Sequence, residues 1–160
     1  MKASWQAIDI PGRECLEPRH LVLDLNGTIA LDGGLLPGVA ERVAALRERL
    51  TIYLLTADTR GRGAATADQL GVQLHRLTPG QEAGQKAGFV HSLGAAHTVA
   101  VGNGANDALM LAAAGLGIAV LGGEGLAVAA LQAADLVVPD VAAALDLLLH
   151  PQRLIATLRQ

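Results

Sequence analysis

The sequence predicts an α/β fold, a three-layer αβα sandwich around a central, mostly parallel sheet. Short apolar runs alternate along the 160 residues with segments of helical pattern, which is typical of β-α-β units. The strongest runs show no polar–apolar alternation, so those strands should be buried on both faces. Hydrophobic residues make up 51% of the chain, yet it has one Trp, one Tyr and one Phe. The core should therefore consist mainly of Ala, Leu and Val.

The predicted strands are the apolar runs bounded by polar residues or glycine. Residues 72–77 alternate in polarity, which indicates an outer strand, and residues 135–138 are short enough to lie at an edge. A sheet of about five strands is expected. The buried strands are predicted at residues 20–25, 51–56, 97–102 and 116–121.

Helical patterns fill the intervals between these runs. The first opens with Pro37, whose missing N–H costs nothing in the first turn of a helix. Just before it, residues 28–36 contain Gly33-Gly34 and should form a small hairpin flap. Helices are predicted at residues 37–50, 63–70, 82–93, 105–114, 125–133, 141–149 and 151–158.

The length fits one domain over residues 1–160, because a second domain would be too small to bury its own core. Residues 1–18 contain Pro11 and Pro18 and precede the first strand. An added hairpin and an extended arm are both compatible with that segment.

Composition excludes several classes of partner and site. The formal net charge is −3, whereas nucleic-acid-binding domains are usually basic, so no nucleic-acid partner is expected. Cys15 is the single cysteine, which excludes an intramolecular disulfide and a Cys-rich metal site. The N-terminal residues lack a signal-peptide pattern, and the most apolar stretch, residues 108–123, is shorter than a ~18-residue span. We therefore expect a cytoplasmic protein with no membrane partner.

Polar residues that could take part in catalysis stand at the predicted strand ends. Asp24 ends the first run and Thr56 ends the second, while Asp107 closes the segment that follows the third. Lys86 stands near the start of the helix before that third strand. In a parallel sheet these positions converge on one edge. Together they suit phosphoryl transfer, in which a carboxylate attacks phosphorus and cations neutralise the phosphoryl oxygens.

The motifs, in this order, resemble those of the haloacid dehalogenase (HAD) superfamily, and most of all the phosphorylation domain of P-type ATPases. The resemblance extends roughly over residues 21–138. The residues that carry it are Asp24-Leu25-Asn26-Gly27-Thr28, Thr56-Ala57-Asp58, Lys86 and Gly102-Asn103-Gly104-Ala105-Asn106-Asp107.

This resemblance implies a HAD-like Rossmannoid sheet with strand order 5-4-1-2-3. It also implies a Mg²⁺-dependent phosphohydrolase that forms an aspartyl-phosphate on Asp24, either a phosphatase or a slow, ATPase-like hydrolase acting on a phosphorylated substrate. The implied catalytic residues are Asp24, Asn26, Thr56 and Lys86. The implied Mg²⁺ ligands are Asp24, Asn26, Asn103 and Asp107.

Two positions depart from the family pattern. Asn26 stands where most phosphatases of the superfamily have the Asp that acts as general acid and base, a role typically worth about 10²–10⁴-fold in rate. Asn103 stands where the family usually has a metal-ligating Asp. These changes leave open an alternative function, in which the chain is a catalytically degenerate HAD-fold binding or assembly module.

Cap insertions are not expected. The intervals from Asp24 to Thr56 and from Thr56 to Lys86 have room for a flap, helices and one strand, but not for a cap domain. An open site could be closed by a second subunit, so a homo-oligomer with residues 141–158 at its interface is predicted. Two local alternatives stay open: Asp58 either caps a turn or lines the site, and the glycines of segment 122–125 either bind an anion or form a turn.

Overall fold

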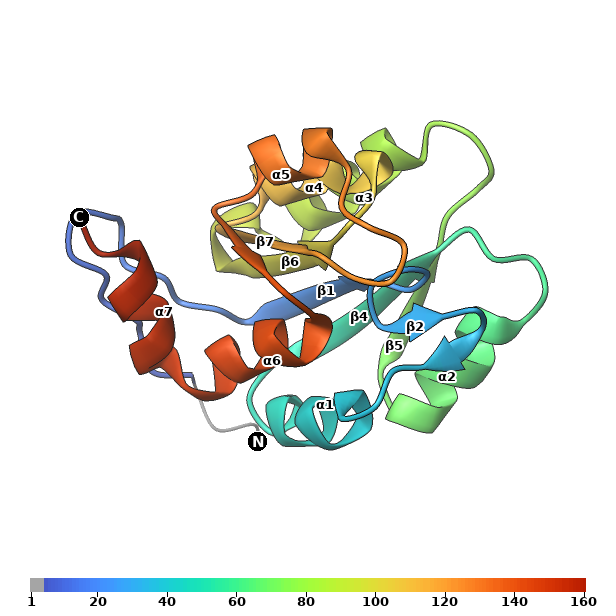
Figure 1. The fold of residues 1–160 in the computed structure, drawn as a ribbon, viewed down its shortest axis with the longest axis horizontal. Helices are drawn as coiled ribbons and strands as arrows, with labels where there is room; N and C mark the ends of the chain where they lie inside the picture. The colour runs from blue at the N-terminus through green and yellow to red at the C-terminus, as the bar shows by residue number, and fades with distance from the viewer. Residues whose placement is uncertain (1–4) are drawn as a thin grey trace.

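The central sheet has six strands in the order β5-β4-β1-β6-β7-β8, and every neighbouring pair is parallel (Figure 1). The computed structural model describes residues 5–160. The predicted fold class is confirmed. The strand order differs from 5-4-1-2-3 by one added strand, because the short segment before Pro139 pairs with β7 at the edge. The strands are β1 (His20–Asp24), β4 (Thr51–Thr56), β5 (Gln73–Arg76), β6 (Thr98–Gly102), β7 (Leu116–Val120) and β8 (Leu136–Val138).

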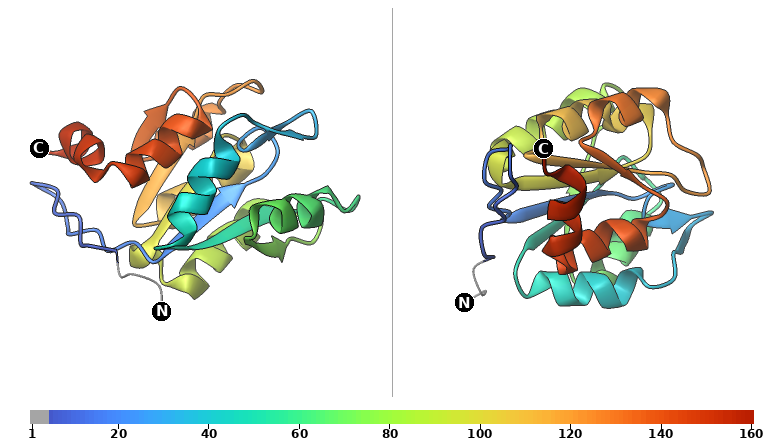
Figure 2. Two further views of the ribbon diagram at one scale, coloured as in Figure 1. Left: turned by 90° about the horizontal axis from the view of Figure 1, so that it is seen from below. Right: turned by 60° about the vertical axis from the view of Figure 1, so that its left-hand side comes forward.

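Helices cover both faces of this sheet. Helices α3, α4 and α5 lie on one face, and α1, α2 and α6 lie on the other (Figures 1 and 2). Each face has its own apolar core, and the core residues are mainly Leu, Val, Ile and Ala. The helices are α1 (Val39–Arg47), α2 (Arg62–Leu70), α3 (Glu82–Leu93), α4 (Ala108–Ala113), α5 (Val128–Ala133), α6 (Val141–Leu149) and α7 (Pro151–Leu158).

Several predicted helices are shorter than the apolar pattern indicated. Residues 105–107 form a separate 3₁₀ turn, η2 (Ala105–Asp107), ahead of α4. Another such turn, η1 (Ala95–His97), takes up the first residue of the predicted third strand. Residues 125–127 do not belong to α5, because Gly125 has a positive φ of 80° and donates its N–H to the carbonyl of Gly122. Turn geometry therefore overrides hydrophobic periodicity at these ends.

Between β1 and α1 the chain forms only a small antiparallel hairpin, β2 (Ala30–Leu31) and β3 (Gly34–Leu35), as predicted for the flap. Between β4 and β6 it forms only α2, β5, α3 and η1. The described residues thus contain no cap domain.

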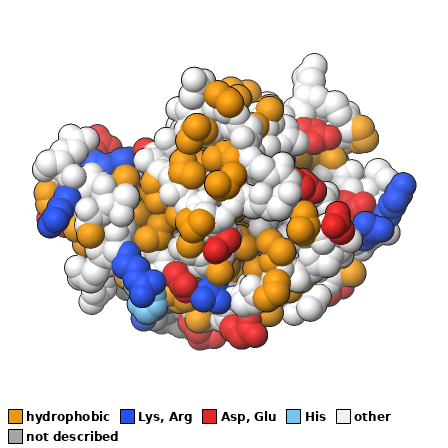
Figure 3. Space-filling model, in the orientation of Figure 1, with side chains coloured by type: hydrophobic (Ala, Val, Ile, Leu, Met, Phe, Trp, Pro, Cys, Tyr) orange, Lys and Arg blue, Asp and Glu red, His pale blue; other side chains and the backbone are white. Residues whose placement is uncertain are grey.

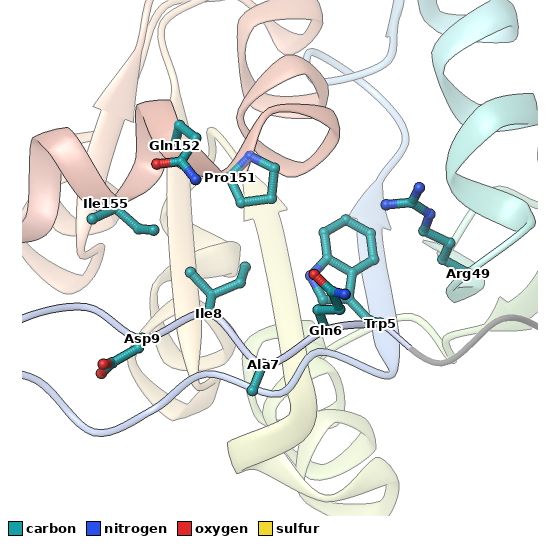
Figure 4. Close-up of a pocket in the computed structure, with 9 residues that line it drawn as sticks. All are labelled: Trp5, Gln6, Ala7, Ile8, Asp9, Arg49, Pro151, Gln152 and Ile155. Carbon is teal, nitrogen blue, oxygen red and sulfur yellow. The ribbon is translucent and has the colours of Figure 1, made fainter.

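The described part of the N-terminal segment folds back on itself. Ile8 and Leu16 exchange two backbone hydrogen bonds of 2.8 and 3.0 Å, which closes an antiparallel loop. This loop and the start of α7 border a cavity of about 530 Å³ near Arg49, whose guanidinium lies 5.7 Å from the ring centre of Trp5 (Figure 4). Arg49 lies two residues before β4, so this cavity lies near the amino ends of the strands. Residues 1–4 of the predicted arm lie outside the described residues.

Helix α6 is strongly apolar, whereas α7 buries one face through Leu154 and Leu158. Within residues 5–160 no single helix is long and apolar enough to cross a membrane, although α6 and α7 together reach that length with a bend of 102° between them. The apolar face of α6 packs into the core through Val141, Ala144, Leu145 and Leu148. Large hydrophobic side chains that remain exposed lie instead on and around α4, α5 and β8, and hydrophobic atoms gather over α4 and α5 in Figure 3. These side chains are Leu109, Leu121, Val128, Leu131 and Val137.

Candidate active site

The carboxyl ends of β1, β4 and β6 meet at one edge of the sheet, and the side chains that follow them line a cavity of about 420 Å³. The parallel arrangement brings these strand ends together, as expected for an α/β sheet. Of the predicted site residues, only Asp107 does not line this cavity. The lining residues are Asp24, Asn26, Thr56, Ala57, Asp58, Glu82, Lys86, Asn103, Gly104, Asn106 and Glu124.

Lys86 is the centre of the buried charge. Its Nζ lies 2.8 Å from Asp24 Oδ1 and 2.7 Å from Asp107 Oδ1, and its side chain is only 2% exposed. A buried ammonium is costly unless carboxylates pair with it, so two carboxylates around one lysine form a mutually dependent set. The second turn of α3 therefore delivers a fixed positive charge to the end of β1.

Asp107 lies behind the cavity and is fully buried. Its Oδ1 contacts Lys86, and its Oδ2 accepts the backbone N–H groups of Asn103 and Gly104 at 3.0 and 2.9 Å. A Cβ added to Gly102 would lie 2.5 Å from the carboxyl carbon of Asp107, so glycine is needed at the end of β6. Both oxygens of Asp107 thus hold the protein's own groups in place.

Thr28 connects the two sides of the site. Its hydroxyl oxygen lies 3.3 Å from Asp24 Oδ2 and 3.1 Å from Asn103 Oδ1, and the residue is fully buried. A single hydroxyl proton is therefore shared between two acceptors. The sequence motif that contains Thr28 does not indicate this role, because only the fold brings Asn103 next to it.

The ionisation of the site reflects its burial. Burial and the nearby carboxylate of Asp107 raise the pKa of Asp24 to about 6, against the lowering effects of Lys86 and Thr28. For Lys86, burial alone would lower the pKa, but Asp24 and Asp107 raise it above its ordinary value. Lys86 is therefore a cation at neutral pH, and additional positive charge near Asp24 would favour its ionised form.

Thr56 and Asp58 form a hydrogen-bonded turn between β4 and α2. The backbone N–H of Asp58 donates to Thr56 Oγ1 at 3.0 Å, so the hydroxyl can still donate into the cavity. The Asp58 carboxylate accepts the N–H groups of Arg60 and Gly63, both at 3.0 Å. These backbone hydrogen bonds lower the pKa of Asp58. Both alternatives for Asp58 hold, because it caps the turn and lines the cavity.

Three further cavity residues, Glu82, Asn106 and Glu124, were not predicted as site residues. Glu82 and Asn106 are linked by a 3.1 Å hydrogen bond across one rim. Glu124 comes from the loop after β7, where the glycines of segment 122–125 form a turn. Nothing in the sequence around Glu124 indicates that this loop reaches the end of β1. Only the pairing of β6 with β7 places it there.

The donors that line the cavity suit a hard divalent cation. Asp24, the Asn103 amide and the main chain at Asn26 offer oxygen ligands, and Mg²⁺ usually takes one or two carboxylates together with substrate phosphate and water. Across residues 5–160, no three His, Cys, Asp or Glu side chains converge on one point, so a cation here would also need amide, main-chain, water or phosphate oxygens. Lining carboxylates also outnumber the single lining cation, Lys86, so a phosphate would be repelled unless a cation accompanied it.

Comparisons with known proteins agree with this architecture. Residues 4–115 match the sequence model of the haloacid dehalogenase-like hydrolase family. An uncharacterized protein of Methanocaldococcus jannaschii is 59% identical over 39 residues, which is 24% of this chain and 89% of that protein. The probable cation-transporting ATPase G of Mycobacterium tuberculosis (strain H37Rv) is 42% identical over 99 residues. That match covers 60% of this chain but only 12% of the ATPase.

A solved structure shares the fold. The 3-deoxy-D-manno-octulosonate 8-phosphate phosphatase of Moraxella catarrhalis, determined with magnesium, phosphate and the KDO molecule, has a TM-score of 0.69 at 17% identity. The similarity covers 89% of this chain and 94% of that one. The sheet with its covering helices is thus shared with that protein.

Proposed function

Because the chain belongs to the haloacid dehalogenase-like hydrolase family, we propose that it is a Mg²⁺-dependent phosphohydrolase with Asp24 as its nucleophile. The observation that carries this proposal is the cavity in which buried Lys86 contacts Asp24 at 2.8 Å and Asp107 at 2.7 Å. A carboxylate at the floor of an open cavity, beside a fixed cation, is arranged to attack a phosphorus atom.

In this mechanism the Asp24 carboxylate displaces the leaving group and becomes an aspartyl-phosphate. Lys86 neutralises charge on the transferred group, and the Thr56 hydroxyl donates a hydrogen bond to one of its oxygens. Asp107 acts as a positioning residue, since it fixes Lys86 and the backbone of Asn103. Water then attacks phosphorus and the bond from phosphorus to Asp24 breaks, which releases phosphate, passes the water proton to solvent and restores the Asp24 carboxylate.

A divalent cation bound by Asp24, the Asn103 amide and the main-chain carbonyl of Asn26 would supply charge stabilisation for the phosphoryl oxygens. Asn26 lies at the rim and is exposed, where a general acid and base would be needed. An amide neither gives nor takes the proton, so the proposed reaction is slow at the hydrolytic step.

The experiment is phosphate release from a panel of phosphorylated metabolites, run beside ATP, with and without Mg²⁺. Asp24→Asn is the control, because an amide of nearly the same shape is a far poorer nucleophile. Mg²⁺-dependent release that falls by more than about 1,000-fold in Asp24→Asn would support the proposal. Release by the wild type that the substitution leaves unchanged would remove Asp24 from the mechanism.

The second candidate is a binding or assembly module that has lost catalysis. Asn26 and Asn103 favour it, because both lack the charge or proton that hydrolysis uses. A wild type that binds phosphorylated ligands but releases no phosphate from any of them would support this function. A cytoplasmic location and self-association stay predictions.

A further inference from the structure

The loop between β7 and α5 places one carboxylate beside the proposed cation site. Glu124 lines the same cavity as Asp24 and Asn103. A Cβ built on Gly27 would overlap Glu124 Oε2 and would lie 2.7 Å from Asn103 Nδ2. The Glu124 carboxylate and the Asn103 amide therefore meet over the backbone of Gly27, one residue after Asn26.

Hydrogen bonds to Asn103 hold this loop against the site. Asn103 Nδ2 donates to the carbonyl of Gly125 at 3.3 Å, and the N–H of Ala127 donates to the carbonyl of Asn103 at 2.9 Å. A Cβ on Gly122 would lie 3.2 Å from the carbonyl oxygen of Gly27, so the loop backbone packs directly on the segment after β1. Glu124 is exposed at its tip, yet its backbone is held by the residues that form the site.

The proposed cation ligands at Asp24, Asn26 and Asn103 carry little negative charge. The Asn103 side chain is neutral, and both oxygens of Asp107 already hold Lys86 and backbone N–H groups. Asp24 would then be the only anionic ligand of a divalent cation, and it shares its charge with Lys86. Cation affinity in oxygen sites depends on the number of charged ligands.

We propose that Glu124 supplies the second negative charge of the cation site, in place of residue 103. The carboxylate faces the cation directly or through one of the waters that Mg²⁺ retains. This inference rests on the proposed function. It assigns a role to the loop after β7, a strand that lies on the other side of β1 from β4.

Mn²⁺ binding, measured by electron paramagnetic resonance and calorimetry, tests the proposal without any turnover. Glu124→Gln should weaken Mn²⁺ binding by at least about 10-fold, the lower end of the loss that follows removal of a group supporting a metal site. The matched control is Glu82→Gln, which removes the same charge from another lining residue, whose carboxylate accepts a hydrogen bond from Asn106. Its effect should be clearly smaller, because the carboxylate of Glu82 is already engaged by the amide of Asn106.

Restoring the charge at residue 103 gives a second test. Asn103→Asp in the Glu124→Gln background should recover most of the lost Mn²⁺ affinity. Equal Mn²⁺ affinity in wild type and Glu124→Gln, or equal losses in Glu124→Gln and Glu82→Gln, would overturn the role of Glu124. If Asp24-dependent phosphate release persisted in that case, the proposed function would stand. Absence of phosphate release from a wild type whose Mn²⁺ binding depends on Glu124 would refute the function and leave the cation site.

Discussion

At the scale of single residues, Asn26 should limit the rate at which the proposed aspartyl-phosphate is hydrolysed. Its side chain is exposed at the rim of the cavity that holds Asp24, so an acid there would reach both a leaving group and an attacking water. With an amide in its place, the aspartyl-phosphate should persist. Asn26→Asp should raise steady-state phosphate release by about 10-fold or more, within the range that general acid–base catalysis supplies.

Steady-state release and the amount of phosphoenzyme, compared between wild type and Asn26→Asp, check this prediction. The phosphoenzyme should accumulate in the wild type and decline in the variant. Rapid wild-type turnover without accumulation, and unaltered by Asn26→Asp, would show that another group moves the proton. Asp58 is the next candidate, since it lines the same cavity and its lowered pKa keeps it ionised.

At the scale of elements, glycines let α4 approach the sheet closely. A Cβ added to Gly117 in β7 would overlap the carbonyl oxygen of Leu111 in α4, which is backbone and cannot rotate away. Gly117→Ala should therefore lower the free energy of unfolding by about 1–3 kcal/mol, as overpacking usually does. Gly88→Ala is the matched control, because a Cβ at that helical position meets nothing within 4 Å.

Chemical denaturation of both variants measures this difference. Gly88→Ala should raise the free energy of unfolding by about 0.5–1 kcal/mol, since alanine is the better helix former. A destabilisation of equal size in both variants would mean that close packing of α4 on β7 is not the reason for Gly117.

The ion pair between α1 and α6 should make stability depend on pH. Arg42 Nε lies 2.8 Å from Asp146 Oδ1 and its Nη2 lies 3.1 Å from Oδ2. The hydrogen bonds from Arg42 lower the pKa of Asp146 below its ordinary value of 3.8. Because the pKa is lower in the folded state, the stabilisation is present above 3.8 and is lost as pH falls through the folded-state value.

Asp146→Asn should consequently lower the thermal midpoint at pH 7 by about 1–3 °C, in keeping with the modest value of exposed ion pairs. The difference from wild type should shrink below pH 3.8 and disappear as Asp146 becomes protonated. Scans at several pH values check this, with Arg42→Gln expected to follow the same pattern. A difference that is constant from pH 7 into the acid range would show that packing, not charge, links the two helices.

At the scale of the whole molecule, hydrophobic patterning and strand-end chemistry predicted most of the architecture. The apolar runs correspond to β1, β4, β6 and β7, and their polar ends meet at one cavity. The pattern could not place Glu124, because its position follows from the pairing of β6 with β7 and from the turn at Gly125. It also could not show that α6 turns its apolar face inward, since amphipathic helices at a core and at a subunit interface look alike.

Ligand binding should stabilise the molecule as a whole through the same site. Beryllofluoride with Mg²⁺ mimics a phosphoryl group on a carboxylate, and it should attach to Asp24, which lines the cavity. At a concentration 100-fold above its Kd, such a ligand adds about 2.7 kcal/mol to the free energy of unfolding. For a chain of this size the thermal midpoint should then rise by about 5–10 °C.

The measurement is a thermal scan of wild type and Asp24→Asn, each with Mg²⁺ alone and with Mg²⁺ plus beryllofluoride. Only the wild type should gain stability from the fluoride, because the attachment needs a carboxylate oxygen at residue 24. The metal-free Asp24→Asn protein should be at least as stable as wild type at pH 7. Burial and Asp107 already oppose the charge on Asp24, as its pKa of about 6 indicates. An equal rise in both proteins would place the fluoride elsewhere and separate Asp24 from the phosphoryl site.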